Sequence, residues 1–308
     1  GRGFWILDDY TPLREVSENS LQQEASLFPV RKTPWYLPKL PLGSFEAGSK
    51  ASQGDAFFVA PNPPFGAVFT YYLRDDLKAR RDTRLEEEKK VAAEGGETPD
   101  PGWGPLRAEE TEEDPAIVLT VTDTSGKVIR RIEAPVKAGF HRVAWDLRYP
   151  MSSAWTPETP GESYLQVLGP LAAPGTYTVS LAKRIDGMVT ELAAPQSFEV
   201  VSIVERAIEG SPPGEMVAFT LRLDDINRQV DGAEAALEAM LTETGAIKAT
   251  LMRSRAPAEM RDEARRIEME LLALQDKLKG NERRDLFNDP GPVSVSARLQ
   301  AAVIGTFR

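Results

Sequence analysis

The sequence predicts a mixed β and α fold, in which an antiparallel β-sandwich is followed by a long antiparallel helical hairpin. Short runs of β-branched and aromatic residues, separated by turn signals, recur within residues 54–202. From residue 219 onward, apolar residues instead recur in alternating steps of four and three, the heptad spacing of a coiled-coil seam. The 308 residues are enough for one large domain or for two to three modest ones.

Residues 1–9 predict a short strand that has no partner close in sequence. Prolines punctuate the stretch that follows, and aromatic residues lie between them. Since proline removes backbone donors and favours extended geometry before it, we expect residues 10–53 to form an extended connector whose aromatic side chains insert into neighbouring surfaces. Residues 62–73 then predict a turn that leads into a strand.

An acidic insertion is expected at 75–114, where 14 Asp and Glu face 7 Lys and Arg. We expect a surface segment between two strands, with a solvated helix over 76–93 and a flexible tip over 94–105 that is rich in Gly and Pro. An acidic docking surface or a calcium patch is the alternative, although the spacing of an EF-hand loop is absent.

The remaining strands of the predicted sandwich are joined by recognisable turns. The turn Asp123–Gly126 is expected to connect strands 117–122 and 127–132, and Asp186–Gly187 to connect strands 173–181 and 196–201.

One further strand is expected over 140–148. Its alternation predicts that large apolar side chains share one face, with His141 and Arg142 near the other face or at the strand start. The apolar residues are Phe140, Val143, Trp145 and Leu147.

Two antiparallel helices are predicted over 219–251 and 260–278, with a reversal at Ser254–Pro257 and an end at Gly280–Asn281. A third segment from Ser294 is expected to pack back on them as another helix. The first seam comprises Leu223, Ile226, Val230, Ala233, Leu237, Met240, Thr244, Ile247 and Leu251, and the second comprises Met260, Ala264, Ile267, Leu271, Leu274 and Leu278.

Composition excludes several classes of chemistry. Without Cys and with one His, the chain has no disulfide, thiolate zinc site, cysteine nucleophile or multi-histidine metal site. The net charge of −10 argues against binding to nucleic acid or to anionic membranes, and no apolar run approaches the roughly 18 residues of a membrane span. We therefore predict no catalytic, cofactor-binding or metal-binding residues.

The residue types that can carry chemistry have structural interpretations here. His141 is expected to be a structural histidine at a strand end, and adjacent side chains in the pairs Asp8–Asp9 and Asp224–Asp225 point apart. Aromatic rings at Trp35, Tyr36 and Trp155 could instead stack on sugar rings or contact a partner; anchoring loops to the core is the alternative.

Several blocks of the sequence carry a resemblance. Residues 1–9 (GRGFWILDD) look like the closing strand of a propeller, and the blocks at 62–73 (NPPFGAVFTYYL), 139–149 (GFHRVAWDLRY) and 173–177 (APGTY) look like segments that follow it. In these blocks the chain resembles the C-terminal region of bacterial sortilin-like, BNR-repeat β-propeller proteins, often labelled glycosyl hydrolases. Residues 121–130, followed by Trp145–Asp146 and 175–177, also resemble the Ig-like domain of flagellar hook-capping proteins.

The resemblance implies an Ig-like sandwich in an exported protein, extracellular or periplasmic, whose propeller lies upstream. The expected function is a non-catalytic region that packs on or presents the propeller and mediates protein contacts. A carbohydrate-binding accessory or glycan hydrolase component is one alternative, and self-assembly into a homo-oligomer through the helical seam is another.

Overall fold

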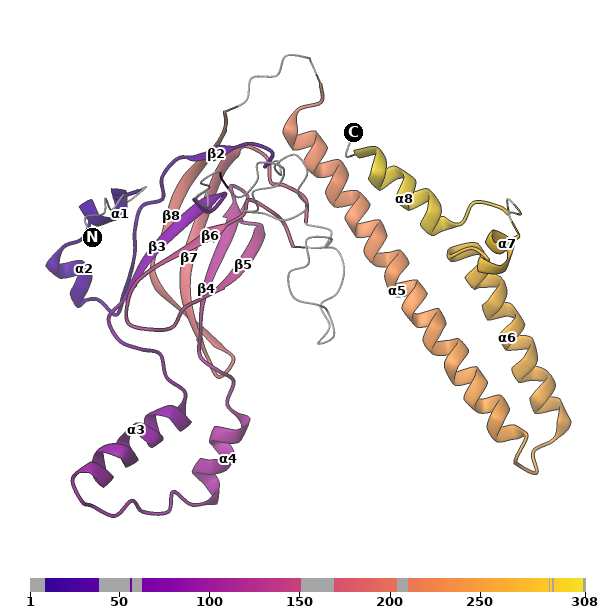
Figure 1. The fold of residues 1–308 in the computed structure, drawn as a ribbon, viewed down its shortest axis with the longest axis horizontal. Coiled ribbons are helices and arrows are strands. Elements are labelled where there is room, and N and C mark those ends of the chain that lie inside the picture. The colour runs from indigo at the N-terminus through magenta and orange to yellow at the C-terminus, as the bar shows by residue number, and fades with distance from the viewer. Residues whose placement is uncertain are drawn as a thin grey trace. The chain divides into compact units, whose positions relative to one another are not determined.

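A computed structural model describes residues 9–38, 56, 63–150, 169–203, 210–287, 289 and 291–306. The strand predicted over 1–9 therefore lies outside the described residues, apart from Asp9. The chain divides into two compact units, which we call the β unit (1–150 and 171–210) and the helical unit (151–170 and 211–308). Figure 1 shows strands in the first and long helices in the second, so the fold is mixed β and α.

Two sheets form the β unit. The first has the order β1–β3–β6 and the second the order β2–β8–β7–β4–β5, with every pair antiparallel except β2 with β8. The strands are β1 (Ala25–Leu27), β2 (Thr33–Trp35), β3 (Ala67–Leu73), β4 (Ala116–Asp123), β5 (Val128–Ala134), β6 (Gly139–Trp145), β7 (Gly175–Ile185) and β8 (Met188–Ser202).

The stretch expected to be a connector over 10–53 contributes to both sheets in its described part. It begins with two short helices, α1 (Thr11–Arg14) and α2 (Glu18–Gln22). β1 then pairs with β3, and β2 pairs with β8. Residues 10–38 thus belong to the β unit itself, although their backbone is partly extended as predicted.

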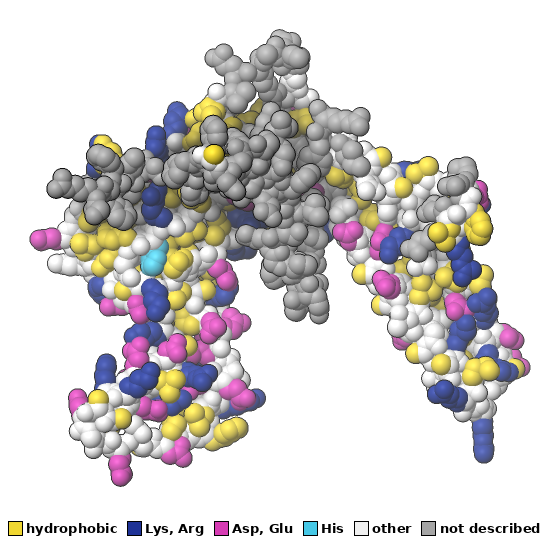
Figure 2. Space-filling view, in the orientation of Figure 1, with side chains coloured by type: hydrophobic (Ala, Val, Ile, Leu, Met, Phe, Trp, Pro, Cys, Tyr) yellow, Lys and Arg dark blue, Asp and Glu magenta, His cyan; other side chains and the backbone are white. Residues whose placement is uncertain are grey.

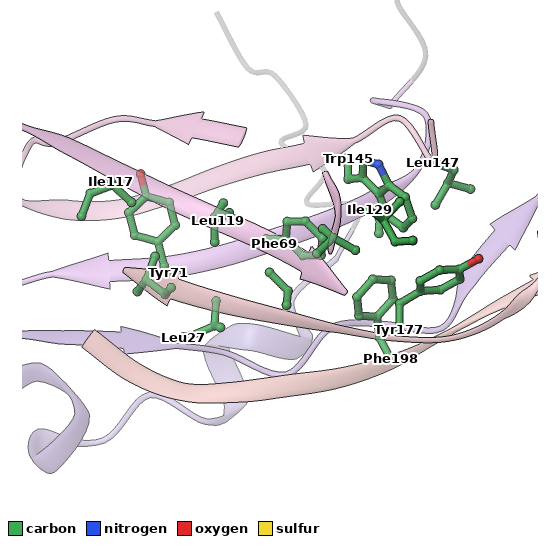
Figure 3. Packing of buried hydrophobic residues seen from close by; sticks show 14 of the residues in the cluster. Leu27, Phe69, Tyr71, Ile117, Leu119, Ile129, Trp145, Leu147, Tyr177 and Phe198 are labelled. Atoms are coloured by element: carbon green, nitrogen blue, oxygen red, sulfur yellow. The ribbon is translucent and has the colours of Figure 1, made fainter. Parts of the chain in front are cut away.

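Both sheets share one hydrophobic core (Figure 3). The Phe69 ring from the first sheet meets the Phe198 ring from the second at 5.5 Å between centroids, and the Trp145 and Tyr177 rings meet at 5.3 Å. Both contacts are edge-to-face, the arrangement that aromatic quadrupoles favour. The hydroxyl of the buried Tyr177 ring has a hydrogen-bond partner, because it donates to the carbonyl of Ala173 at 2.6 Å.

Both predicted turns are confirmed. The β4–β5 turn is closed by the amide of Gly126, which donates to the Asp123 carbonyl at 3.0 Å, and Gly126 has a φ of 82°. In the β7–β8 turn, Asp186 and Gly187 have φ values of 51° and 77°, as a tight hairpin turn with two positive φ angles requires.

The predicted facing of strand 140–148 is right for Val143, Trp145 and Arg142 but wrong for Phe140 and His141. In β6, Trp145 is buried, whereas Phe140 is 45% exposed and lies against Tyr72 and Phe28. Since side chains two apart share a face, His141 lies on the same side as Trp145, and Arg142 on the same side as Phe140. The strand ends at Trp145, and Leu147 reaches the core from a left-handed backbone position with a φ of 58°.

The acidic insertion forms two helices between β3 and β4, α3 (Arg80–Ala93) and α4 (Trp103–Thr111). α3 confirms the predicted helix, whereas α4 begins within the segment expected to be a flexible tip. Arg84 joins the helices, because its guanidinium donates to both carboxylate oxygens of Glu109 at 2.7 and 2.9 Å and also to Glu88 at 2.6 Å. This hydrogen bonding lowers the pKa of the Glu109 carboxyl below its usual value.

The helical unit contains α5 (Pro213–Leu251), α6 (Ala258–Leu278), α7 (Glu282–Leu286) and α8 (Val295–Thr306). α5 and α6 run antiparallel and side by side (Figure 1), joined by the predicted reversal that ends at Pro257. Gly280, with a φ of 94°, follows the end of α6 as expected. The Ser294 hydroxyl accepts from the amide of Ala297 and caps α8, which packs on α5 through Leu299.

The predicted seam is only half buried. On α5 the buried residues are Leu223, Val230, Leu237 and Thr244, each seven residues after the last, and on α6 they are Ala264 and Leu271. The second column of each seam is exposed, for example at Ile226, Met240 and Ile267. The residues four positions after the buried ones are half-buried, namely Asn227, Glu234, Leu241 and Lys248, so α5 packs along these two columns. A residue three positions after a buried one is rotated by about 60° in the other sense, which turns that column away from the partner helix.

We predict that Gly66→Ala lowers the free energy of unfolding of the β unit by more than about 1 kcal/mol. Gly66 has a φ of 107°, and a Cβ there would lie 1.8 Å from the carbonyl oxygen of Trp145. Gly175→Ala is the matched control, because nothing lies within 4 Å of its Cβ position. Thermal unfolding followed by near-UV circular dichroism measures both, and equal melting temperatures would contradict the close approach at Gly66.

We also predict that the β unit loses stability as the pH rises from about 10 to about 12. Burial raises the pKa of Tyr177 to about 12, whereas an unfolded tyrosine ionises near pH 10. Below about pH 10 the Tyr177 hydroxyl is neutral in both the folded and the unfolded chain. The loss of stability therefore begins only when this tyrosine ionises in the unfolded chain. Tyr177→Phe should make the loss less steep in urea titrations at each pH, and Tyr10→Phe, at an exposed ring, should leave it unchanged.

Candidate functional site

A groove of about 720 Å³ lies on the β unit, within the volume range of small-molecule and peptide sites. Five segments that are distant in sequence line it: Asp9, residues 31–34 with Tyr36, residues 63–66 with Val68, Arg142, and Val201 with Ile203 at the end of β8. The fold brings them together because Val68 and Arg142 come from the neighbouring strands β3 and β6, while Thr33 and Val201 come from the paired strands β2 and β8.

One part of the groove is cationic. Arg31 and Arg142 are exposed, and their charges act on the carboxylate of Asp9, which also accepts the amide of Thr11 at 2.9 Å. Burial raises the pKa of Asp9, but the hydrogen bonds from Thr11 and the charges of both arginines outweigh it, so this pKa lies below its usual value. The charge of Lys32 is paired with Glu199 at 3.0 Å. Among the charged side chains that line the groove, the guanidinium groups of Arg31 and Arg142 therefore outnumber the one carboxylate, that of Asp9.

The other part of the groove is apolar and rigid. The Tyr36 ring meets the Phe65 ring edge-on, with 4.9 Å between centroids. Three proline side chains extend this surface, at Pro34, Pro63 and Pro64. Proline has a fixed φ and little conformational entropy to lose, so a ligand meets a preformed surface.

The three aromatic residues predicted as contacts have different surroundings. Tyr36 lines the groove, whereas Trp35 packs on the core and its Nε1 donates to the carbonyl of Ala172 at 2.7 Å. Trp35 thus anchors the chain, as the alternative interpretation held. Trp155 lies outside the described residues.

His141 has a structural environment. Its Nε2 is 2.5 Å from the carbonyl oxygen of Lys137, and its ring lies over Tyr71 with 5.1 Å between centroids. Asp225 is exposed and accepts from Arg228 and Gln229 at 3.1 Å, whereas burial raises the pKa of the partly buried Asp224, against the opposing charge of Arg228. Asp8, the partner of Asp9, lies outside the described part of the chain.

A smaller hollow of about 320 Å³ lies beside α3, where Lys78 pairs with Glu86 at 2.6 Å. In the segments that the structure describes, no group of three or more His, Cys, Asp and Glu side chains could hold a metal ion. None of the described helices has both the length and the apolar character needed to cross a bilayer. The groove is therefore the site that we develop below.

Arg31, Arg142 and Phe65 were missed as site residues by sequence reasoning. Their positions are 34 or more residues apart, and no local motif links them. The alternation predicted for strand 140–148 already placed Arg142 near the face opposite Trp145, which is the one available signal.

Comparison with known proteins gives no relative: no family model matches the chain, and no curated protein matches it either.

We predict that Arg142→Ala raises the pKa of Asp9 toward its usual value, because one of the two positive charges that stabilise the carboxylate is removed. A ¹³C NMR titration of the aspartate carboxyl groups measures the change. Arg131→Ala, at an exposed position on β5, is the control and should not move the Asp9 titration. An unchanged Asp9 in Arg142→Ala would show that the two groups do not interact.

Proposed function

We propose that the chain is a non-catalytic interaction region of an exported protein, the part that follows a β-propeller. In this proposal an Ig-like β-sandwich and a helical hairpin bind other protein segments by shape and charge. The observation that carries it is the groove, which combines two guanidinium groups with a rigid surface of aromatic and proline side chains.

The chemistry of the groove favours an extended protein segment with at least one carboxylate. Arginine pairs with carboxylates through two parallel hydrogen bonds, and these are among the stronger hydrogen bonds in proteins. Aromatic side chains lining a groove are typical of domains that bind extended, proline-containing peptides, since such peptides lose little entropy on binding. A partner segment that combines proline, apolar and acidic residues fits both parts of the groove.

A glycan that carries a carboxylate is the second candidate, because Tyr36 faces the groove as the sugar-stacking hypothesis expected. Support for it is weaker than for a peptide. Trp35 packs on the core and donates a hydrogen bond to Ala172. The Tyr36 ring is half-buried and packs edge-on with Phe65, which reduces the ring surface available to a sugar.

The test uses two synthetic peptide arrays whose extended sequences alternate proline and aromatic residues with glutamate in one array and with lysine in the other. We predict that the full chain binds the glutamate array in preference to the lysine array. Arg31→Glu and Arg142→Glu should each weaken binding at least about tenfold, since each replaces a charge-assisted hydrogen bond by repulsion. Fluorescence anisotropy with the best peptide measures the affinity.

The control is Arg131→Glu, which makes the same change of charge on β5, outside the groove. It should bind the peptide as the unchanged chain does. Equal weakening by Arg131→Glu would show that only net charge matters. If the chain binds a glycan array that carries uronic acids and binds neither peptide array, the glycan candidate replaces this proposal.

The propeller part of the proposal rests on the resemblance of residues 62–73 and 139–149 described above. The open reading frame upstream of Gly1 tests it, since it should encode β-propeller repeats and an export signal. A propeller domain produced separately should then cosediment with the chain, and independent sedimentation would contradict the predicted contact.

A further inference from the structure

Each long helix of the helical unit carries a second apolar column that stays exposed among the described residues. On α5 the column recurs every seven residues and contains Phe219, Ile226, Ala233, Met240 and Ile247; on α6 it contains Met260, Ile267 and Leu274. Their large side chains are between 40% and 53% exposed, in contrast to the buried columns beside them. We call these two exposed columns together the open face.

Both columns lie on the same side of the helix pair. Each is rotated by about 60° in the same sense from the buried column of its own helix. Because α5 and α6 are antiparallel, an approximate two-fold axis normal to the plane of the pair relates the two helices. Columns rotated equally from the buried column of each helix therefore lie on the same side of that plane. Figure 2 shows hydrophobic side chains interspersed with charged ones on the visible surface of the helical unit.

The opposite side of the pair is polar and partly covered. Residues four positions after a buried one lie there, rotated by about 40° in the other sense. Lys248 and Glu268 are two of them, and they form an ion pair at 2.6 Å between the helices. α8 occupies this side as well, since Ser296 donates to Glu234 at 2.5 Å and Leu299 packs on Val230.

We infer that the open face is the interface with a second copy of this chain, which completes a four-helix bundle around the columns. In such bundles every helix contributes two apolar columns to a shared core and lies antiparallel to its neighbours. Here the sequence provides two columns on each helix, whereas the part of the chain that the structure describes provides one pair of long helices. A two-fold axis in the plane of the interface makes every contact between the copies antiparallel.

A second copy fits because the open face is complementary to itself. Its two columns contain apolar side chains and no charge, so neither helix requires a partner of different chemical character. The column on α5 is about 42 Å long and that on α6 about 21 Å, which at a helix width of about 10 Å gives on the order of 600 Å² per copy. Specific interfaces need roughly 500 Å² or more per partner, so the area is sufficient for a dimer.

The test measures the molar mass of the full chain by sedimentation equilibrium over a range of concentrations. We expect twice the chain mass of 33.9 kDa, and a return to the single mass in the double variant Ile226→Glu with Ile247→Glu. Two carboxylates without partners would then be buried in the interface, which should weaken dimerisation at least about a hundredfold. Both positions are exposed in the single chain, so helical circular dichroism should be retained.

The matched control is the double variant Ala239→Glu with Ala246→Glu. It adds the same charges to the same helix at exposed positions, rotated by about 160° from the buried column. It should remain a dimer. A monomer at every concentration for the unchanged chain, or a dimer that survives Ile226→Glu with Ile247→Glu, would overturn the inference.

A second measurement uses the absence of cysteine from the chain, so that one introduced cysteine carries a single spin label. A label at Met240→Cys should be immobilised in the dimer and report a distance to its copy, whereas one at Ala239→Cys should stay mobile. A mobile label at residue 240 in a proven dimer would place the interface elsewhere. Arg142→Glu should leave the dimer intact, because this inference does not depend on the function proposed for the groove.

Discussion

The groove depends on the packing of aromatic rings between the two sheets. Trp145 is fully buried, and its carbonyl lies so close to Gly66 that a side chain would not fit there. Phe65 comes directly before Gly66 and meets the ring of Tyr36, whose neighbour Trp35 is anchored by its hydrogen bond to the carbonyl of Ala172. The groove is therefore built on the rigid core, as a preformed binding site requires.

In the helical unit the constraint is the side of α5 on which its partner helices pack. They cover the buried column and the half-buried column four positions after it, so the column three positions after the buried one is turned away from them. Leu223, Val230 and Leu237 are buried against α6 and α8, so Ile226 and Met240 remain in water. Fully burying such a side chain is worth roughly 1.5–3 kcal/mol, of which these half-exposed residues forgo a part, and natural sequences seldom keep a regular apolar column without a use.

Sequence patterns predicted the parts of the fold that depend on local signals. Asp186–Gly187 specified a hairpin, and heptads specified α5 and α6. Strands β1 and β2 were not predicted, because three residues are too few to show a period. Phe140 was assigned to the wrong face, because alternation alone does not define where a strand starts. Of the groove, only Tyr36 was named as a candidate contact from the sequence. Arg31 and Arg142 were not, because only the pairing of strands brings them to the same groove.

The two proposed surfaces have opposite physical character, which allows one chain to hold two contacts independently. Binding at Arg31 and Arg142 would rest on charge and would weaken as salt screens it. Association through Ile226 and Ile247 would rest on the hydrophobic effect, which sulfate and phosphate salts strengthen. Because the whole chain carries a net charge of −10, two copies also repel each other at low ionic strength. Rising salt would therefore favour the dimer while releasing an acidic ligand, so the two contacts respond to the same variable in opposite directions.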